Sequence, residues 1–321
     1  MVNEILIQYF SFYVLAILVC QYNFNDYFYI KTKNYIIFYF FGIFLLLIYI
    51  IILYIIKGRK IIEHMERKNF IKDSKLKITN SKIEVDVIEN NVRYTKVINN
   101  SFQLTQLLQN LDKNYYMTFY KKIGGKKRRD SKLEDHLSFV PIAYGFYFYL
   151  VNKQEIPNIQ TFCDFFINSF CEKKGNKYHF KPNYSNNKNY YFDRQNLDAK
   201  IARAYGSYLR EITLLQRLFE LQEKNKKYAD FDIFYDIQED ILGGADIVIK
   251  TKTKTVGLLI TQNNKNADYY NNLKQKYRHK YQYDECIYVK VFEDETEKHG
   301  DVLIFTENVA KSILDKIFLM K

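Results

Sequence analysis

Two long apolar runs open the chain. The first extends from Ile5 to Tyr22, with Gln8 as its most polar member, and the second, Tyr35 to Ile56, contains no charged residue. The second run is long enough to cross a bilayer as a helix. The first lacks both a basic start and a small-residue cleavage site, which argues against a signal sequence. With the short loop 23–34 between them, the two runs predict a transmembrane helical hairpin over residues 1–56.

The residues that directly follow the second run set the expected orientation. Lys57 to Lys60 read "KGRK", and positive charge beside a span favours the cytoplasmic side. We therefore expect a two-pass protein of the inner (cytoplasmic) membrane whose C-terminal domain lies in the cytoplasm. A charged helical stalk, 57–72, would connect the membrane to the rest of the chain.

The next part of the chain, up to about residue 195, predicts a middle α+β region. Residues 75–99 alternate apolar and polar positions in short runs, as a small antiparallel sheet does. Residues 102–170 have mostly helical patterns, interrupted at 124–130. Residues 176–195 are polar, rich in asparagine and tyrosine, and predicted to be irregular, so we place a domain boundary there.

The pattern changes again after that boundary, over residues 196–321. A helix with a broad apolar face is predicted at 197–224, and three strands, a helix, two strands and a closing helix follow it. Their expected ranges are 231–240, 245–251, 256–261, 268–281, 285–292, 301–305 and 308–318. This order predicts an α/β fold, with a mixed sheet flanked by helices.

Charge and cysteine usage narrow the function without deciding it. The formal net charge is +12, and residues 1–56 contain two basic and two acidic residues, so the whole excess belongs to the cytosolic part. Its partner is expected to be a polyanion, either the anionic inner leaflet or nucleic acid. The four cysteines form no CxxC pair, which argues against a structural zinc site and fits a reducing compartment.

A basic segment stands out in the middle region. "GGKKRRD", 124–130, places a flexible glycine pair before four consecutive cations, Lys126, Lys127, Arg128 and Arg129. Such a run is either a solvated loop or a loop that contacts phosphates.

An aspartate in an apolar strand carries the main chemical signal. In "GGADIVIK" Asp246 precedes a run that is apolar on both sides, as in a strand buried on both faces. A buried carboxylate needs a partner or a metal. Glu211 in the preceding helix and Gln262 at the end of the next strand could converge with it on a divalent cation.

An alternative explains the same residues structurally. Asp246 would cap a turn and satisfy backbone donors, Gln262 would simply end a strand, and Glu211 would pair with Lys200, Arg203 or Arg210. Glu220 and Asp240 are available as other acids.

The order "GSYLRE", "GGADIVI" and a following strand that ends in glutamine resembles the PD-(D/E)XK nuclease superfamily, in particular its Mrr-like restriction endonuclease branch. The resemblance covers about residues 197–318. It implies that Asp246 is a metal ligand, that Gln262 stands where the second acidic ligand usually is, and that Glu211 helps hold the metal or its water. The implied cofactor is Mg²⁺ or Mn²⁺, and the implied activity is a Mg²⁺-dependent phosphodiesterase (deoxyribonuclease).

The chain departs from this family at one position. The family has a lysine two residues after the glutamine, where this chain has Asn264. Lys265 and Lys274 are candidates to replace it catalytically, with Lys276 as a further candidate. Together with Arg278, Lys276 would also contact the DNA backbone, unless this helix face is only solvated.

These observations predict a membrane-anchored, metal-dependent DNA endonuclease that defends the cell against phage or plasmid DNA. The expected partners are DNA and the lipid bilayer, and a homo-oligomer stays open. The alternative is a catalytically degenerate nuclease-fold protein that binds nucleic acid or a partner at the membrane. A third, weaker hypothesis makes the hairpin the effector, which would oligomerise and perturb the membrane.

Overall fold

The computed structural model describes most of the region that follows the two apolar runs. The described residues are 75–89, 92–113, 115–130, 133, 142–184, 190–261 and 283–320, and all belong to one compact unit, Glu63–Lys321. Among them, no helix combines the length and the apolar character that a membrane crossing requires. The predicted spans 5–22 and 35–56 and the predicted stalk 57–72 lie outside the described residues.

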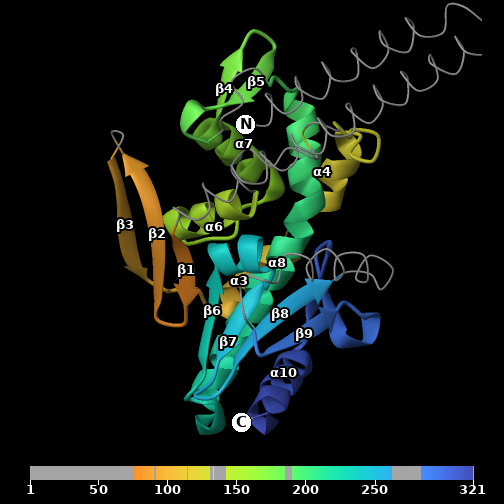
Figure 1. Cartoon of the computed structure of the whole chain (residues 1–321). Coiled ribbons are helices and arrows are strands. Elements are labelled where there is room, and N and C mark those ends of the chain that lie inside the picture. Colours follow the sequence, from red (N-terminus) through yellow and green to blue (C-terminus); the bar gives the residue numbers. More distant parts are fainter. Residues whose placement is uncertain are drawn as a thin grey trace, which may run out of the picture. The chain divides into compact units, whose positions relative to one another are not determined.

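A mixed sheet forms the framework of the described part (Figure 1). Its seven strands lie in the order β3-β2-β1-β6-β7-β8-β9. They are β1 (Leu76–Thr79), β2 (Lys82–Glu89), β3 (Val92–Asn99), β6 (Asp232–Asp236), β7 (Ile247–Lys250), β8 (Thr255–Thr261) and β9 (Glu285–Lys290). All neighbouring pairs are antiparallel except β8 and β9, which are parallel. The predicted α/β class and mixed sheet are thus confirmed.

The sheet continues across the predicted domain boundary. The antiparallel sheet predicted for 75–99 exists as β1, β2 and β3, but β1 also pairs with β6, matching Ile78 with Tyr235. The main hydrophobic core likewise combines residues from both sides of position 195. The segments 75–184 and 190–320 therefore share one sheet and one core.

Strands β6 and β7 are buried on both faces, as predicted for the "ADIVIK" segment. Ile233, Tyr235 and Ile249 belong to the main core, whereas Phe234 and Val248 belong to a smaller cluster with Ala245. Because side chains alternate along a strand, these two sets lie on opposite faces of the sheet.

Three predicted elements differ from the structure. The strand expected at 231–240 ends at Asp236, whose Oδ1 accepts the backbone N–H of Gln238 (2.8 Å) and so begins a helical segment. The irregular region 176–195 contains β5 (Lys177–Phe180), which pairs with β4 (Cys171–Lys174). The strand expected at 301–305 is β11 (Val302–Phe305), but it pairs with β10 (Thr296–His299) instead of joining the main sheet. In the last two cases the strand pairs with a neighbouring segment of the chain as a hairpin, which differs from the predicted arrangement.

Six described helices pack with the sheet and with one another. They are α3 (Leu104–Asp112), α4 (Tyr116–Lys122), α6 (Ile142–Lys153), α7 (Ile159–Phe170), α8 (Arg194–Lys224) and α10 (Glu307–Leu319). The helix predicted at 268–281 lies outside the described residues. Helix α8 extends over 31 residues and is buried along most of its length, because α3, α4, α6, α7 and α10 all pack against it. It therefore connects the helical layer with the sheet (Figure 1).

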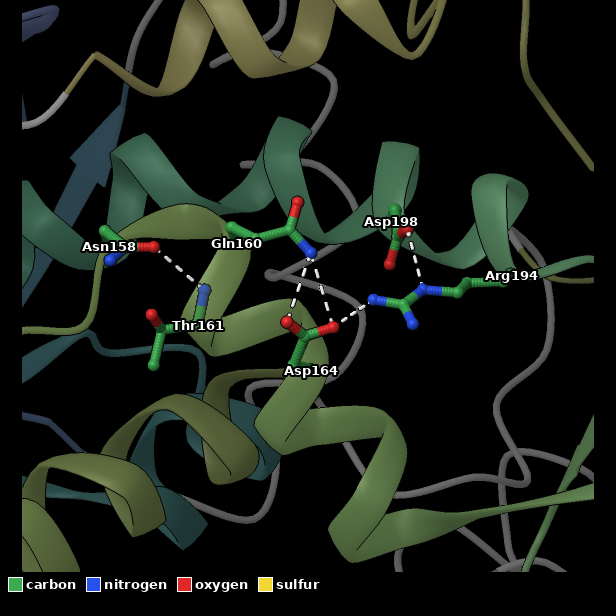
Figure 2. A network of polar contacts seen from close by, with 6 residues as sticks. All are labelled: Asn158, Gln160, Thr161, Asp164, Arg194 and Asp198. Atoms are coloured by element: carbon green, nitrogen blue, oxygen red, sulfur yellow. Dashed lines mark hydrogen bonds and ion pairs between the residues drawn. The ribbon is translucent and has the colours of Figure 1, made fainter.

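A polar network joins the start of α8 to α7 (Figure 2). Arg194 donates to Asp164 and, through Nε, to Asp198 Oδ2 at 3.4 Å. Asp164 also accepts from Gln160, and Asn158 caps α7 by accepting the backbone N–H of Thr161. Burial raises the pKa of Asp198. The network thus links the first turns of α8 to α7.

Gly145 allows α6 and α7 to pack closely. A Cβ at this position would lie 2.5 Å from the ring of Phe166, which is fully buried and has no room to move. Gly145→Ala is therefore expected to lower the free energy of unfolding by about 1–3 kcal/mol through overpacking, although alanine favours helix by about 1 kcal/mol. Thermal denaturation measures this, and Phe166→Leu in the same chain should restore part of the loss. An unchanged or higher melting temperature would contradict this packing.

Candidate functional site

Three carboxylates from three separate elements form what we term the acidic cluster. Glu211 belongs to α8, Asp240 to a π-helical turn (Glu239–Gly243) between β6 and β7, and Asp246 directly precedes β7. Both aspartates raise the pKa of Glu211 through their charge, so the three groups lie within electrostatic reach of one another. The structure thus brings together two of the predicted metal ligands, Glu211 and Asp246, and adds Asp240, one of the alternative acids.

Asp246 is held by the backbone of β8. Its own N–H donates to the carbonyl of Leu258 (2.8 Å), and its Oδ2 accepts the N–H of Ile260 (2.5 Å). Gly244, with φ of +77°, ends the preceding turn in a left-handed conformation that glycine adopts without strain. Asp246 Oδ2 therefore satisfies a backbone donor, as the structural alternative predicted.

Glu211 is almost completely buried, with 6% of its surface exposed. Burial is the largest cause that raises its pKa, followed by the charges of Asp246 and Asp240, while Arg210 acts in the opposite direction. Its Oε2 accepts a hydrogen bond from the hydroxyl of Tyr147 (3.3 Å). A carboxyl in such surroundings retains its proton unless a cation compensates the charge.

Other residues considered as partners of Glu211, or as acids in its place, form hydrogen bonds or ion pairs with other groups. Arg203 donates to the carbonyls of Gly125 and Arg128, and Lys200 donates to the carbonyl of Leu133. Glu220 lies further along α8, where it pairs with Lys224. Of the three basic residues considered as partners, Arg210 lowers the pKa of the Glu211 carboxyl through its charge.

Two buried tyrosines that the sequence analysis did not single out contact the acidic cluster. Tyr147 of α6 donates to Glu211, and Tyr235 of β6 donates to Asp240 Oδ2 (3.0 Å). Strand alternation could have placed Tyr235 on the core face. Nothing distinguishes Tyr147 from the other aromatic residues of "IAYGFYFYLV".

The donor chemistry of the acidic cluster fits a hard divalent cation such as Mg²⁺ or Mn²⁺, because all three groups supply carboxylate oxygens. Within the part of the chain that the structure describes, however, no three His, Cys, Asp or Glu side chains lie close enough to hold one ion together. The predicted ligand Gln262 lies outside the described residues. The described carboxylates therefore fit a divalent cation by their chemistry, but the described residues by themselves do not form a metal site.

The remaining residues predicted for the nuclease-like domain also lie outside the described residues. They are the catalytic candidates Lys265 and Lys274, the predicted nucleic-acid contacts Lys276 and Arg278, and Asn264.

The basic segment 124–130 forms a turn that follows α4, and the structure gives its glycine pair defined packing roles. Gly124 has φ of +68°, and Gly125 packs on the ring of Tyr120, where a Cβ would lie 1.8 Å from a ring carbon. Arg203 of α8 holds the turn through Nη1, which donates to the Gly125 carbonyl (3.3 Å) and to the Arg128 carbonyl (3.1 Å).

The four predicted phosphate contacts in this turn are not equivalent. Lys126, Lys127 and Arg129 are exposed. Arg128 is half-buried, and its Nε donates to the carbonyl of Ile123 at 2.8 Å. Three cations are therefore presented to solvent, and the fourth stabilises the turn that presents them. We term Lys126, Lys127 and Arg129 the basic turn.

Comparisons of the chain with protein-family models, with curated proteins and with solved structures gave no match.

The burial of Glu211 predicts a specific pH dependence in the metal-free protein. The unfolded chain loses the Glu211 proton near the ordinary pKa of 4.5, whereas the folded chain retains it to higher pH. The folded state therefore binds more protons in that window, and stability must fall as pH rises through it. Glu211→Gln cannot ionise, so its melting temperature should fall less between pH 5 and pH 8 than that of the unaltered chain.

The size of this effect follows from linkage. Each unit by which the pKa is raised corresponds to about 1.4 kcal/mol, or about 2–4 °C in melting temperature at pH 8. Asp198 and Asp236 also have raised pKa values and remain in the variant, so part of the slope should persist. Glu155→Gln, which changes an exposed glutamate that accepts from Tyr149, is the control. Equal slopes for Glu211→Gln and the unaltered chain would contradict a proton held at Glu211.

Proposed function

We propose that this chain is a membrane-anchored, metal-dependent DNA endonuclease of the PD-(D/E)XK type, held at the cytoplasmic face of the inner membrane, and that it defends the cell against phage or plasmid DNA. The observation that carries the proposal is the convergence of Glu211 and Asp246. These are the two acids that the resemblance selected, and they lie 35 positions apart in the chain. The charge of Asp246 nevertheless acts on the buried Glu211 carboxyl.

The arrangement of the elements supports the same proposal. The resemblance requires a helix acid, a strand acid and a side chain at the end of the next strand to meet. Here α8 supplies Glu211, β7 follows Asp246, and β8 pairs with β7 and ends at Thr261, directly before Gln262. Gln262 thus continues the chain from the strand whose backbone already binds Asp246.

In this proposal Asp246, Gln262 and Glu211 hold one or two Mg²⁺ or Mn²⁺ ions. A bound ion supplies the Lewis acidity that activates water and offsets the charge on the phosphate. Within this site the hydroxyl of Tyr147 donates to Glu211 Oε2. Lys265 or Lys274 provides the positive charge that Asn264 lacks.

The basic turn supports DNA as the substrate. Exposed lysine and arginine side chains neutralise phosphates without reading sequence, which suits an enzyme that acts on foreign DNA of any sequence. Arg203, which holds the turn, precedes Glu211 by eight residues on α8. At 1.5 Å per residue the two positions are about 12 Å apart along the helix axis. A DNA duplex bound at the acidic cluster would be large enough to reach the level of Arg203 as well.

A second candidate function follows from two specific observations. Asn264 stands in the position of the family's lysine, and the described carboxylates do not by themselves form a complete metal site. A catalytically degenerate nuclease-fold protein that binds nucleic acid or a partner at the membrane would have these features.

Plasmid cleavage by the full chain, purified in detergent or reconstituted in nanodiscs, separates the two functions. The endonuclease is expected to nick or linearise plasmid in Mg²⁺ or Mn²⁺ and to be inactive in EDTA. DNA binding without metal-dependent cleavage would reject the endonuclease and favour the degenerate protein.

A further inference from the structure

We propose that α4 and the basic turn form one surface that binds a single strand of DNA, with the ring of Tyr115 stacking on an unpaired base. We term Tyr115, Lys121, Lys122 and the basic turn together the α4 surface. The inference rests on the proposed function for DNA as the partner, and it deepens that function by naming the form of DNA that binds here. The α4 surface belongs to a segment to which the resemblance, 197–318, does not extend.

The cations of the α4 surface are not balanced by acids in the same segment. From Tyr115 to Arg129 the chain contains Lys121, Lys122 and the four cations at 126–129, and no aspartate or glutamate. Lys121 and Lys122 are exposed, as is the basic turn that follows them. Protein surfaces usually mix charges of both signs, so a stretch with one sign only favours a polyanion as its partner.

The acids that approach this segment are already engaged. Asp112 pairs with His299, with 2.8 Å between Oδ1 and Nδ1, and Oδ1 of Asp130 accepts a backbone N–H at 3.2 Å. Asp301, in the hairpin of β10 and β11, accepts a backbone N–H of the first turn of α4 at 3.0 Å. These carboxylates stabilise the neighbouring turns, and the exposed lysines are left to face solvent.

Helix α4 directs its aromatic side chains toward the core and its lysines away from it. Tyr116, Phe119 and Tyr120 have the spacing i, i+3 and i+4, so they share one face of the helix, and all three pack against the main core. Lys121 and Lys122 lie outside this face and are exposed. The inward face thus holds the helix in place, and the outward face presents the cations.

The α4 surface is fixed to α8 at two points. Gly206 leaves room for Tyr116, because a Cβ at Gly206 would lie 2.6 Å from the Tyr116 hydroxyl oxygen. Arg203, one turn earlier on α8, holds the basic turn through two backbone carbonyls. Since one helix supplies both contacts, the cations of α4 and of the basic turn are presented in a fixed arrangement, which lowers the entropy lost when a ligand binds.

Tyr115 is the feature that favours a single strand. Its exposed fraction is 60%, the largest of any aromatic side chain in the described part of the chain. It precedes Lys122 by seven residues, so the two lie on the same side of α4 and about 10 Å apart along its axis. Neighbouring base pairs cover the faces of the bases in a duplex, whereas an unpaired base of any kind can stack on an aromatic ring. A tyrosine beside several cations therefore fits a single strand without selecting its sequence.

The test measures the affinity of the full chain, purified in detergent, for a labelled oligonucleotide of mixed sequence and for the duplex of the same length, by fluorescence anisotropy in EDTA. Tyr115→Ala should weaken binding to the single strand about 5–100-fold, because it removes the stacking ring. Its affinity for the duplex should stay unchanged. Tyr115→Phe keeps the ring and should keep the affinity. Tyr94→Ala, which removes a tyrosine that is 41% exposed on β3, is the control and should change neither affinity.

A double variant tests the two lysines of α4 separately from the ring. If Lys121 and Lys122 each contact one phosphate of the single strand, replacing both with glutamine should lower the slope of log K against log salt by about 1.4. Lys173→Gln with Lys177→Gln removes two exposed charges from the hairpin of β4 and β5 and should leave the slope unchanged. Equal slopes for the two double variants would contradict phosphate contact at α4.

The results that would overturn the inference are specific. They are no binding of the unaltered chain to the single strand, an unchanged affinity of Tyr115→Ala for it, a loss in Tyr115→Ala that is equal for single strand and duplex, and a loss in Tyr115→Phe as large as in Tyr115→Ala. Melting temperatures of the variants show that each of them is folded.

Failure of this inference can be told apart from failure of the proposed function, because EDTA separates binding from cleavage. If the unaltered chain cleaves plasmid but Tyr115→Ala shows no selective loss for the single strand, this inference fails and the proposed endonuclease stands. If the chain binds the single strand through Tyr115 but does not cleave DNA with metal, the endonuclease fails. The α4 surface then belongs to the alternative protein that binds nucleic acid without cleaving it.

Discussion

Asp246→Asn is expected to abolish the metal-dependent cleavage of plasmid DNA, with a loss in rate of at least about 10²–10³-fold. Asparagine keeps an oxygen that can accept the N–H of Ile260, so the link to β8 is preserved. What is lost is the negative charge, which strengthens the binding of a divalent ion. Removing several kcal/mol of electrostatic stabilisation from the reaction corresponds to a rate loss of this size.

Asp236→Asn is the matched control for this variant. Asp236 lies at the end of β6, and its Oδ1 also accepts a backbone N–H, from Gln238. The control therefore makes the same chemical change in a similar structural role, but outside the acidic cluster, and should retain cleavage. Full activity of Asp246→Asn, or equal losses in the two variants, would contradict the assignment of Asp246 as a ligand.

Neutralising the basic turn is expected to have the second large effect. The triple change Lys126→Gln, Lys127→Gln and Arg129→Gln should weaken binding to duplex DNA roughly 10²-fold at physiological salt. If each cation contacts one phosphate, the slope of log K against log salt should fall by about 3. Fluorescence anisotropy of a labelled duplex, titrated in EDTA at several salt concentrations, measures both quantities.

A control variant with the same change in net charge distinguishes DNA binding at the basic turn from general attraction between DNA and a positively charged protein. Lys173, Lys174 and Lys177 are exposed on the hairpin of β4 and β5. Their triple replacement by glutamine removes the same three charges at another surface. If both triple variants lose affinity equally, DNA responds to net charge and the basic turn has no special role. A fall in the cleavage rate without weaker binding would also contradict its role in phosphate contact.

Local sequence patterns predicted most of the described elements. The helix expected at 197–224 is present as 194–224, and the strands 245–251 and 256–261 are present as 247–250 and 255–261. The strand at 231–240 was predicted too long, because the pattern does not reveal that Asp236 accepts a backbone N–H and begins a turn. The glycine pair at 124–125 was predicted to be flexible because its contact with Tyr120 is not visible in the sequence.

The candidate site was predicted in part. Motif spacing selected Glu211 and Asp246, and the structure brings their charges within reach of each other. It also placed Asp240, previously one alternative among several, in the same cluster. Tyr147 could not be found, because its position in an apolar helix predicts only burial.

By itself, the sequence determined the apolar runs, the excess of positive charge in residues 57–321, and the order of most described helices and strands. It also determined which acids precede or occupy these elements. These are local properties, encoded by periodicity and by composition over a few turns or one strand. Only the tertiary structure decided that β1 continues the sheet at β6, that Arg203 holds the basic turn, and that Tyr147 reaches Glu211 across 64 positions. Contacts of this kind depend on which buried surfaces fit together, and chain spacing does not contain that information.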